Sequence, residues 1–117
     1  MPDTLSRLIR RYEVAASKHG RATLESRSTR EVNRQHDVVA RVYRELRSRG
    51  QESQMALLDL LDSPDRGVQT WVAAHALEFA PERGEPILTQ LAKRNDILGF
   101  DAEMTLKEWR AGRLRFP

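Results

Sequence analysis

The chemistry open to this chain is narrowed first by what the sequence lacks. It contains no cysteine, which excludes disulfides, thiolate metal sites and cysteine nucleophiles. It also has no Gly-rich phosphate loop, no serine nucleophile elbow and no paired carboxylate motif that stands out from its many acidic residues. We therefore expect a protein that is not an enzyme, with no catalytic residue, no cofactor and no metal.

Long apolar runs are missing as well. No stretch approaches the roughly 18 apolar residues that a membrane-spanning helix needs, and residues 1–11 lack the apolar run of a signal peptide. We therefore expect a cytoplasmic protein without a membrane partner. Runs of alternating apolar and polar residues are also absent, which excludes strands and predicts an all-α fold.

The remaining composition is that of one folded domain. A chain of 117 residues with 39% hydrophobic content is long enough for a single core over residues 1–117. Its net charge of +3 is unevenly distributed, because residues 1–50 hold 12 of the 20 basic residues but only 6 of the 17 acidic ones. An acidic partner would therefore meet the first half of the chain.

Helical periodicity and capping residues predict about six helices. Asp3 and Thr4 are candidate N-caps of the first helix and Ser28 of the second, and Gly20 is a candidate stop. Pro86 is expected in a first helical turn, and the chain is expected to fray after Gly112. Residues 21–28 are polar and aperiodic, which predicts a loop. The predicted elements are two N-terminal helices at about 4–19 and 29–49, followed by helical pairs at about 52–79 and 84–111.

The two helical pairs carry an internal repeat with an offset of about thirty residues. Its matching apolar positions are Leu58, Leu61, Ala73 and Leu77 in the first pair and Leu88, Leu91, Ala102 and Leu106 in the second. A unit of this size cannot bury its apolar face alone, so such units stack on their neighbours.

Residues 60–73, which read LLDSPDRGVQTWVA, resemble the HEAT-repeat pattern of paired leucines, an Asp-Pro turn, Val-Arg and then small residues. Gln69 stands where that pattern has arginine, and Val72 where it has a small residue, so the Asp-Arg contact typical of the repeat is not implied. The resemblance implies a right-handed α-solenoid of HEAT-like helical hairpins.

Almost the whole chain also resembles a family of short bacterial all-α proteins of unknown function with a HEAT-like fold. The likeness is carried by residues 33–37, 42–46, 71–74 and 102–112. Relatives of this type are encoded near secreted toxin modules, which implies an immunity-type protein that binds a toxin or another protein partner. The resemblance therefore favours binding over catalysis.

Four residues at matching repeat positions are candidates for partner binding: Trp71 pairs with Phe100, and His75 with Met104. A helical projection places Trp71 about 160° from Ala73, and Phe100 the same angle from Ala102, so neither points along the main apolar stripe. In stacked repeats the second helix of each pair lines the concave surface, where aromatic anchors form hot spots. The alternative is that these side chains pack between the repeats.

A basic face on the second predicted helix supports an alternative function. Arg30, Arg34, Arg41 and Arg44 recur along one side and could contact nucleic-acid phosphates. The alternatives are a solvated helix face and an acidic protein partner, because acidic residues interrupt the strip and no aromatic residues are interleaved with it.

The pair His36-Asp37 matches part of a metal phosphohydrolase motif, but a second histidine and a distant aspartate at suitable spacing are missing. His36 lies between Val32 and Val39 in the apolar pattern, so we expect a hydrogen-bonded structural histidine that faces the core.

Overall fold

The computed structural model of the protein describes residues 3–117. Over this range it contains six α-helices, one 3₁₀ helix and no strand, as the sequence predicts. The elements are α1 (Leu5–Leu24), α2 (Thr29–Ser48), α3 (Gln51–Met55), the 3₁₀ helix η1 (Ala56–Asp62), α4 (Arg66–Phe79), α5 (Pro81–Leu91) and α6 (Ile97–Arg110). None of the helices in this range is both long enough and apolar enough to cross a membrane.

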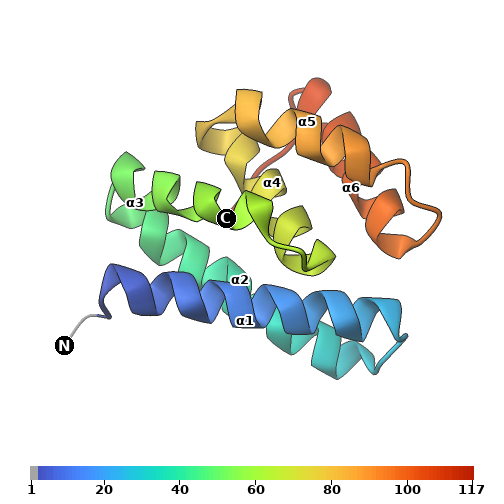
Figure 1. The fold of residues 1–117 in the computed structure, drawn as a ribbon, viewed down its shortest axis with the longest axis horizontal. Helices are drawn as coiled ribbons and strands as arrows, with labels where there is room; N and C mark the ends of the chain where they lie inside the picture. Colours follow the sequence, from blue (N-terminus) through green and yellow to red (C-terminus); the bar gives the residue numbers. More distant parts are fainter. Residues whose placement is uncertain (1–2) are drawn as a thin grey trace.

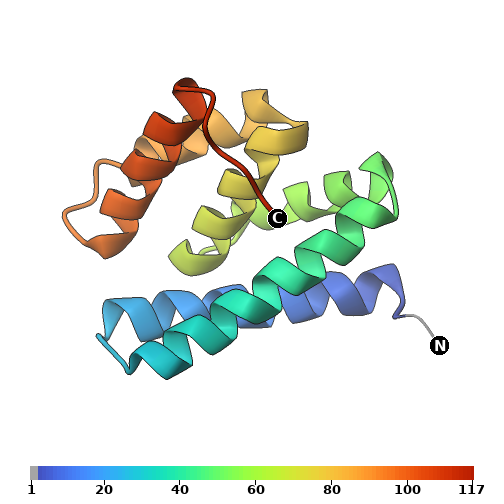
Figure 2. The same cartoon turned by 180° about the vertical axis from the view of Figure 1, so that it is seen from behind.

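The elements form three successive layers. α1 and α2 cross as one antiparallel pair, α3, η1 and α4 form the middle layer, and α5 and α6 form the third (Figure 1). The middle layer packs on both of the others through α4, which contacts α1, α5 and α6. Seen from the opposite side, the segment after α6 returns across the molecule toward α4 and α2 (Figure 2).

Side-chain caps fix where four of the helices begin. Thr4, Ser28, Asp65 and Asp96 each accept a hydrogen bond from the backbone N–H three residues ahead, at 3.2, 3.3, 3.0 and 3.1 Å. Each bond satisfies one of the N–H groups that the first helical turn leaves without a partner. The predicted caps at Thr4 and Ser28 are therefore confirmed.

The matching apolar positions of the repeat form a buried seam. All eight of them are 7% exposed or less: Leu58, Leu61, Ala73, Leu77, Leu88, Leu91, Ala102 and Leu106. The N-terminal pair adds Tyr12, Val39, Tyr43 and Leu46 to the same core. Burial of this apolar seam is the main force that holds the three layers together.

Helix α1 does not end at Gly20, and much of the predicted loop over residues 21–28 is helical. The helix continues to Leu24. Gly20 is buried where α1 crosses α4, and a Cβ atom at this position would lie 2.7 Å from the Cα atom of Gly67. The glycine therefore permits a close approach of two helices instead of ending one of them.

The helix predicted near residues 52–61 is divided in two. A short α-helical turn, α3, passes into the 3₁₀ helix η1 at Ala56. Within η1, Leu58 and Leu61 are three residues apart and both buried. A 3₁₀ helix has three residues per turn, so this spacing places both leucines on its core-facing side.

The first-turn proline of α5 is Pro81, not Pro86. Pro81 follows the N-cap Ala80, and Pro86 lies inside the helix. Proline suits the first turn because the N–H that it lacks would have no intrahelical acceptor there. At Pro86, in contrast, the bond to the carbonyl of Glu82 is lost and the helix continues nonetheless.

The chain beyond Gly112 packs on the protein instead of fraying. Leu114 and Phe116 lie against the hydrophobic core. The guanidinium of Arg47 donates hydrogen bonds to the carbonyl oxygens of Phe116, at 2.9 Å, and Pro117, at 2.8 Å. These contacts hold residues 113–117, hereafter the C-terminal strap, across the face formed by α2 and α4.

Candidate functional site

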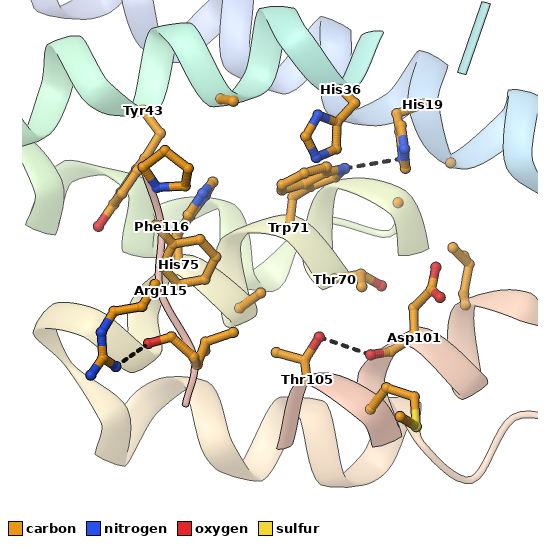
Figure 3. Close-up of a pocket in the computed structure, with 18 residues that line it drawn as sticks. His19, His36, Tyr43, Thr70, Trp71, His75, Asp101, Thr105, Arg115 and Phe116 are labelled. Atoms are coloured by element: carbon orange, nitrogen blue, oxygen red, sulfur yellow. Dashed lines mark hydrogen bonds between the residues drawn. The ribbon is translucent and has the colours of Figure 1, made fainter. Parts of the chain in front are cut away.

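A pocket of about 480 Å³ opens between α1, α2, α4, α6 and the C-terminal strap (Figure 3). This volume lies within the usual range for ligand pockets, roughly 300–1,000 Å³. The lining residues are His19, Gly20, His36, Ala40, Tyr43, Gly67, Thr70, Trp71, Ala74, His75, Leu98, Asp101, Met104, Thr105 and residues 114–117. Apolar and aromatic groups form most of the wall, with a few polar groups set among them.

The indole of Trp71 contacts all three histidines of the chain. Its ring centroid is 5.3 Å from that of His19, 5.3 Å from that of His36 and 5.5 Å from that of His75. These histidines come from α1, α2 and α4, which meet at this point. Three helices therefore fix the position of one half-buried tryptophan at the pocket wall.

A hydrogen bond sets the orientation of this indole. The Nε1–H of Trp71 donates to Nδ1 of His19 at 3.1 Å (Figure 3). Nδ1 can accept only while it carries no proton, so the imidazole of His19 is neutral with its hydrogen on Nε2. Burial, together with the charge of nearby His36, lowers the pKa of His19 and favours this neutral form.

His75 is enclosed by aromatic rings at the deep end of the pocket. Its imidazole stacks on Tyr43 with centroids 3.7 Å apart, and the ring of Phe116 covers it at 4.6 Å. Only 2% of His75 is exposed. Burial, with a smaller contribution from the charge of Arg47, lowers its pKa to about 3, so His75 is neutral at pH 7.

His75 also pairs with a tyrosine of α1. Nδ1 lies 2.6 Å from the hydroxyl of Tyr12. Burial raises the pKa of Tyr12, so its phenol stays protonated and can pair with either neutral tautomer of the His75 ring. This bond joins α1 to α4 beside the pocket.

A polar network joins this aromatic cluster to the C-terminal strap. The hydroxyl of Tyr43 donates to the carboxylate of Glu78 and accepts from Nε2 of Gln54, at 3.0 Å. Glu78 also pairs with Arg47 at 3.2 Å, and Arg47 binds the strap carbonyls. Burial, followed by the hydrogen bond to Glu78, raises the pKa of Tyr43. The strap is thus attached to the core through the same arginine that neutralises Glu78.

Asp101 is the acidic group of the pocket. It extends from α6 toward α4 close to Thr70 (Figure 3) and is partly buried. Within the described residues its carboxylate makes no hydrogen bond and no ion pair, and burial raises its pKa. The neighbouring hydroxyls are already used, because Thr105 donates to the backbone carbonyl of Asp101 at 2.8 Å and Thr70 to that of Arg66 at 2.6 Å.

Three of the four residues predicted as partner contacts line this pocket. Trp71, His75 and Met104 are in its wall, whereas Phe100 lies outside it and is 57% exposed. The repeat therefore places Trp71 and Phe100 in different surroundings. Trp71 packs against histidines between layers, while Phe100 faces solvent.

The prediction that His36 faces the core is wrong. Its side chain is 54% exposed and contacts Trp71 at the pocket instead of the core. Near His36 the apolar side of α2 faces the open pocket instead of the packed core. A side chain on that side of the helix therefore stays accessible to solvent. Nδ1 of His36 lies 3.7 Å from the carboxylate of Asp37. No group of three histidine, aspartate or glutamate side chains in residues 3–117 is arranged to hold a metal ion.

The four arginines of the predicted basic face are all exposed on α2. Arg34 forms an ion pair with Glu31 on the same helix. Within the described part of the chain, Arg30, Arg41 and Arg44 make no ion pair.

Several pocket residues carry no sequence signal of their own. His19 lies next to the glycine that predicts a helix end, Asp101 is one of 17 acidic residues, and the strap falls beyond the predicted helices. These residues meet at the pocket because α1 crosses α4 and because the strap returns across the molecule. The periodicity of apolar residues along one helix predicts neither of these features.

Comparison with known proteins places the chain in a family. A search of curated proteins and a search of solved structures found no match. Residues 7–109 match a family described as a domain of unknown function, DUF2019, and this range spans all six α-helices nearly in full. The match confirms an all-α family of unknown function, and the protein belongs to the DUF2019 family.

Proposed function

We propose that the protein is a non-enzymatic binding module that recognises a protein partner through the pocket and the adjoining surface of α6. The observation that carries this proposal is an exposed apolar strip beside an aromatic pocket. The strip, hereafter the α6 ridge, consists of Ile97, Phe100 and Met104, which are 44%, 57% and 38% exposed. Their spacing of three and four residues places them on one side of the helix.

The ridge and the pocket together resemble the centre of a binding surface. Met104 belongs to both, so the apolar ridge continues into the wall that holds Trp71. Protein interfaces are enriched in tryptophan and methionine at their centres, and anchoring side chains lie in pockets there. The histidine packing around Trp71 holds that anchor in place before a partner binds, which lowers the entropy lost on binding.

The class of partner is inferred from the resemblance of the sequence to HEAT repeats and to short bacterial all-α proteins. The repeated buried seam supports a HEAT-like stacking of the α3–η1–α4 and α5–α6 pairs, and proteins built from such hairpins bind partners on an extended surface. On this basis we propose an immunity-type protein of the bacterial cytoplasm, which would bind a toxin or a similar protein. Fold alone does not determine function, so this assignment depends on the binding surface as well.

Substitution within the ridge tests the proposal. Met104→Arg places a charge at the junction of ridge and pocket, and Met55→Arg places the same charge on α3, where Met55 is similarly exposed at 43%. Each tagged variant is used to capture proteins from the native host, and the captured proteins are identified by mass spectrometry. The proposal predicts one protein that binds both the unmodified protein and Met55→Arg but not Met104→Arg. Capture that is the same for all three would contradict it.

A second candidate function is binding of nucleic acid by the basic face of α2. The observation that favours it is the exposure of Arg30, Arg34, Arg41 and Arg44 along one helix side. Four phosphate contacts would make log K fall against log salt with a slope of about −3 to −4 on duplex DNA. Arg41→Ala should reduce that slope, whereas Arg83→Ala on the exposed surface of α5 should not. Lack of duplex binding at low salt would exclude this function.

A further inference from the structure

We propose that the pocket accepts a lysine or arginine side chain of the protein partner, with its cation paired to the carboxylate of Asp101 and its alkyl stem packed along Trp71. This inference rests on the proposed function and specifies which chemical group of the partner enters the pocket. Within residues 3–117, the chain itself pairs no cation with this carboxylate.

The surroundings of the Asp101 carboxylate differ from those of other acidic residues in this chain. Glu31, Asp96 and Glu108 each bond to a neighbouring arginine, and the hydrogen bond lowers the pKa of each carboxyl. Asp101 is partly buried and, within residues 3–117, has no such cation, so burial alone shifts its pKa upward. A partly desolvated carboxylate without a partner is unfavourable unless a cation binds it.

The surroundings of Asp101 direct it toward an external ligand. The hydroxyl groups of Thr70 and Thr105 flank it in Figure 3, but both donate to backbone carbonyls. Its two oxygens therefore keep their capacity to accept hydrogen bonds from a group in the pocket. A guanidinium or ammonium group supplies donors and charge together, which makes such bonds stronger than those between neutral groups.

The rest of the wall suits the stem of a long basic side chain. Met104 and Leu98 lie on the same helix as Asp101, and Trp71 lies across the pocket on α4. Lysine and arginine side chains carry three or four methylene groups that pack on apolar surface while the charged end stays polar. A cation close to the face of a tryptophan ring is also attracted by the electrons of that ring.

Three ionisable groups of the pocket wall, Arg115, His19 and His75, do not compete at neutral pH. Arg115 points its guanidinium along the strap, where it donates to the carbonyls of Gly112 and Leu114. The bonding and lowered pKa of His19 and the burial of His75 keep both imidazoles neutral. At acid pH, protonation of His19 would add positive charge beside Trp71 and weaken cation binding.

A pair of probes with the same shape tests the charge requirement. Nα-acetyl-arginine methylamide carries the cation, and Nα-acetyl-citrulline methylamide has nearly the same shape without charge. In a Trp109→Phe background Trp71 is the only tryptophan, so its fluorescence reports on the pocket. We expect a saturable change with the arginine probe, with a dissociation constant in the millimolar range typical of small fragments, and no saturable change with the citrulline probe.

Asp101→Asn tests the role of the carboxylate, because it keeps the size of the side chain and removes the charge. We expect affinity for the arginine probe to fall about tenfold or more, as for loss of a charged hydrogen bond. Asp59→Asn, on the exposed surface of η1, is the matched control and should leave affinity unchanged. Equal binding of both probes, no binding of the arginine probe, or unchanged affinity in Asp101→Asn would each overturn the inference.

Partner capture separates this inference from the proposed function. Agmatine, which carries a guanidinium and an ammonium group at the two ends of a four-carbon chain, serves as the small-molecule arm. If agmatine binds in an Asp101-dependent way but Asp101→Asn captures the partner normally, the pocket binds a free small cation and the partner side chain is not its occupant. If Met104→Arg abolishes capture while Asp101→Asn does not, the proposed function stands and the inference fails. The inference requires loss of capture in both variants.

Discussion

The imidazole of His75 lies flat on the phenol ring of Tyr43, with centroids 3.7 Å apart and an angle of 6° between the two planes. The stacked pair joins α4 to α2 and forms the deep wall of the pocket. Because Tyr12 from α1 bonds to the same histidine, three helices converge on one buried neutral imidazole. The stability of the protein and the shape of its pocket therefore depend on the charge state of His75.

The first prediction concerns stability at acid pH. The folded-state pKa of His75 is about 3 against an ordinary value of 6.5, so between these values the unfolded chain binds more protons than the folded one. The free energy of unfolding should therefore fall as pH drops below about 6.5, by up to about 1.4 kcal/mol per pH unit for this group. Urea denaturation between pH 7 and pH 4 measures it. His75→Gln should make the free energy of unfolding less dependent on pH. His36→Gln, which changes the exposed histidine, should leave most of the pH dependence unchanged.

The second prediction concerns the crossing of α1 and α4. In Gly20→Ala the new methyl group would meet the Cα atom of Gly67 at 2.7 Å, so the two helices must move apart. Overpacking of this kind typically costs about 1–3 kcal/mol, and we expect a loss of unfolding free energy in that range. Lys18→Ala, exposed on the same helix, serves as the control. A Gly20→Ala protein as stable as the unmodified one would show that the helices do not approach so closely.

The third prediction concerns the C-terminal strap. Arg47→Met removes the hydrogen bonds to the carbonyls of Phe116 and Pro117 but keeps much of the apolar stem. The strap should then detach more often, and trypsin should cleave after Arg113 and Arg115 severalfold faster. Arg49→Met, which removes an ion pair with Glu45 at the C-terminal end of α2, should be cleaved by trypsin at the original rate. Equal cleavage in both variants would mean that Arg47 does not hold the strap.

The fourth prediction concerns the hydrogen bond between Trp71 and His19. Protonation of Nδ1 removes the acceptor, and because burial lowers the pKa of His19, this occurs below the ordinary value of 6.5. With Trp109→Phe as background, Trp71 fluorescence should change with a midpoint below pH 6.5. His19→Phe should abolish that transition. A transition that persists in His19→Phe would assign it to another group.

The sequence predicts the helices well because their signals are local. The caps at Thr4 and Ser28 and the apolar spacing of the repeat depend on neighbouring residues, and the structure confirms them. Glycine and proline are harder to interpret, because each has more than one role. Gly20 matches a helix stop and also a close helix contact, and two prolines, Pro81 and Pro86, compete for one first turn.

The pocket could be predicted only in part. Repeat symmetry identifies Trp71 and Met104 because they lie on the second helices of the two pairs. It does not identify His19 or Asp101, whose positions depend on the angles at which α1 and α6 cross α4. The same applies to His36. It lies on the apolar side of its helix, as a core residue does, but the pocket occupies the place where the core would continue.

The most direct test of a partner-binding pocket is the pair of indole N–H signals in a two-dimensional ¹H–¹⁵N spectrum. Trp71 lines the pocket, and Trp109 lies outside it near the end of α6. On titration with the captured protein partner, we expect the Trp71 signal to shift or broaden while the Trp109 signal stays in place. A partner that binds with the Trp71 signal unchanged would show that the pocket is not the binding site.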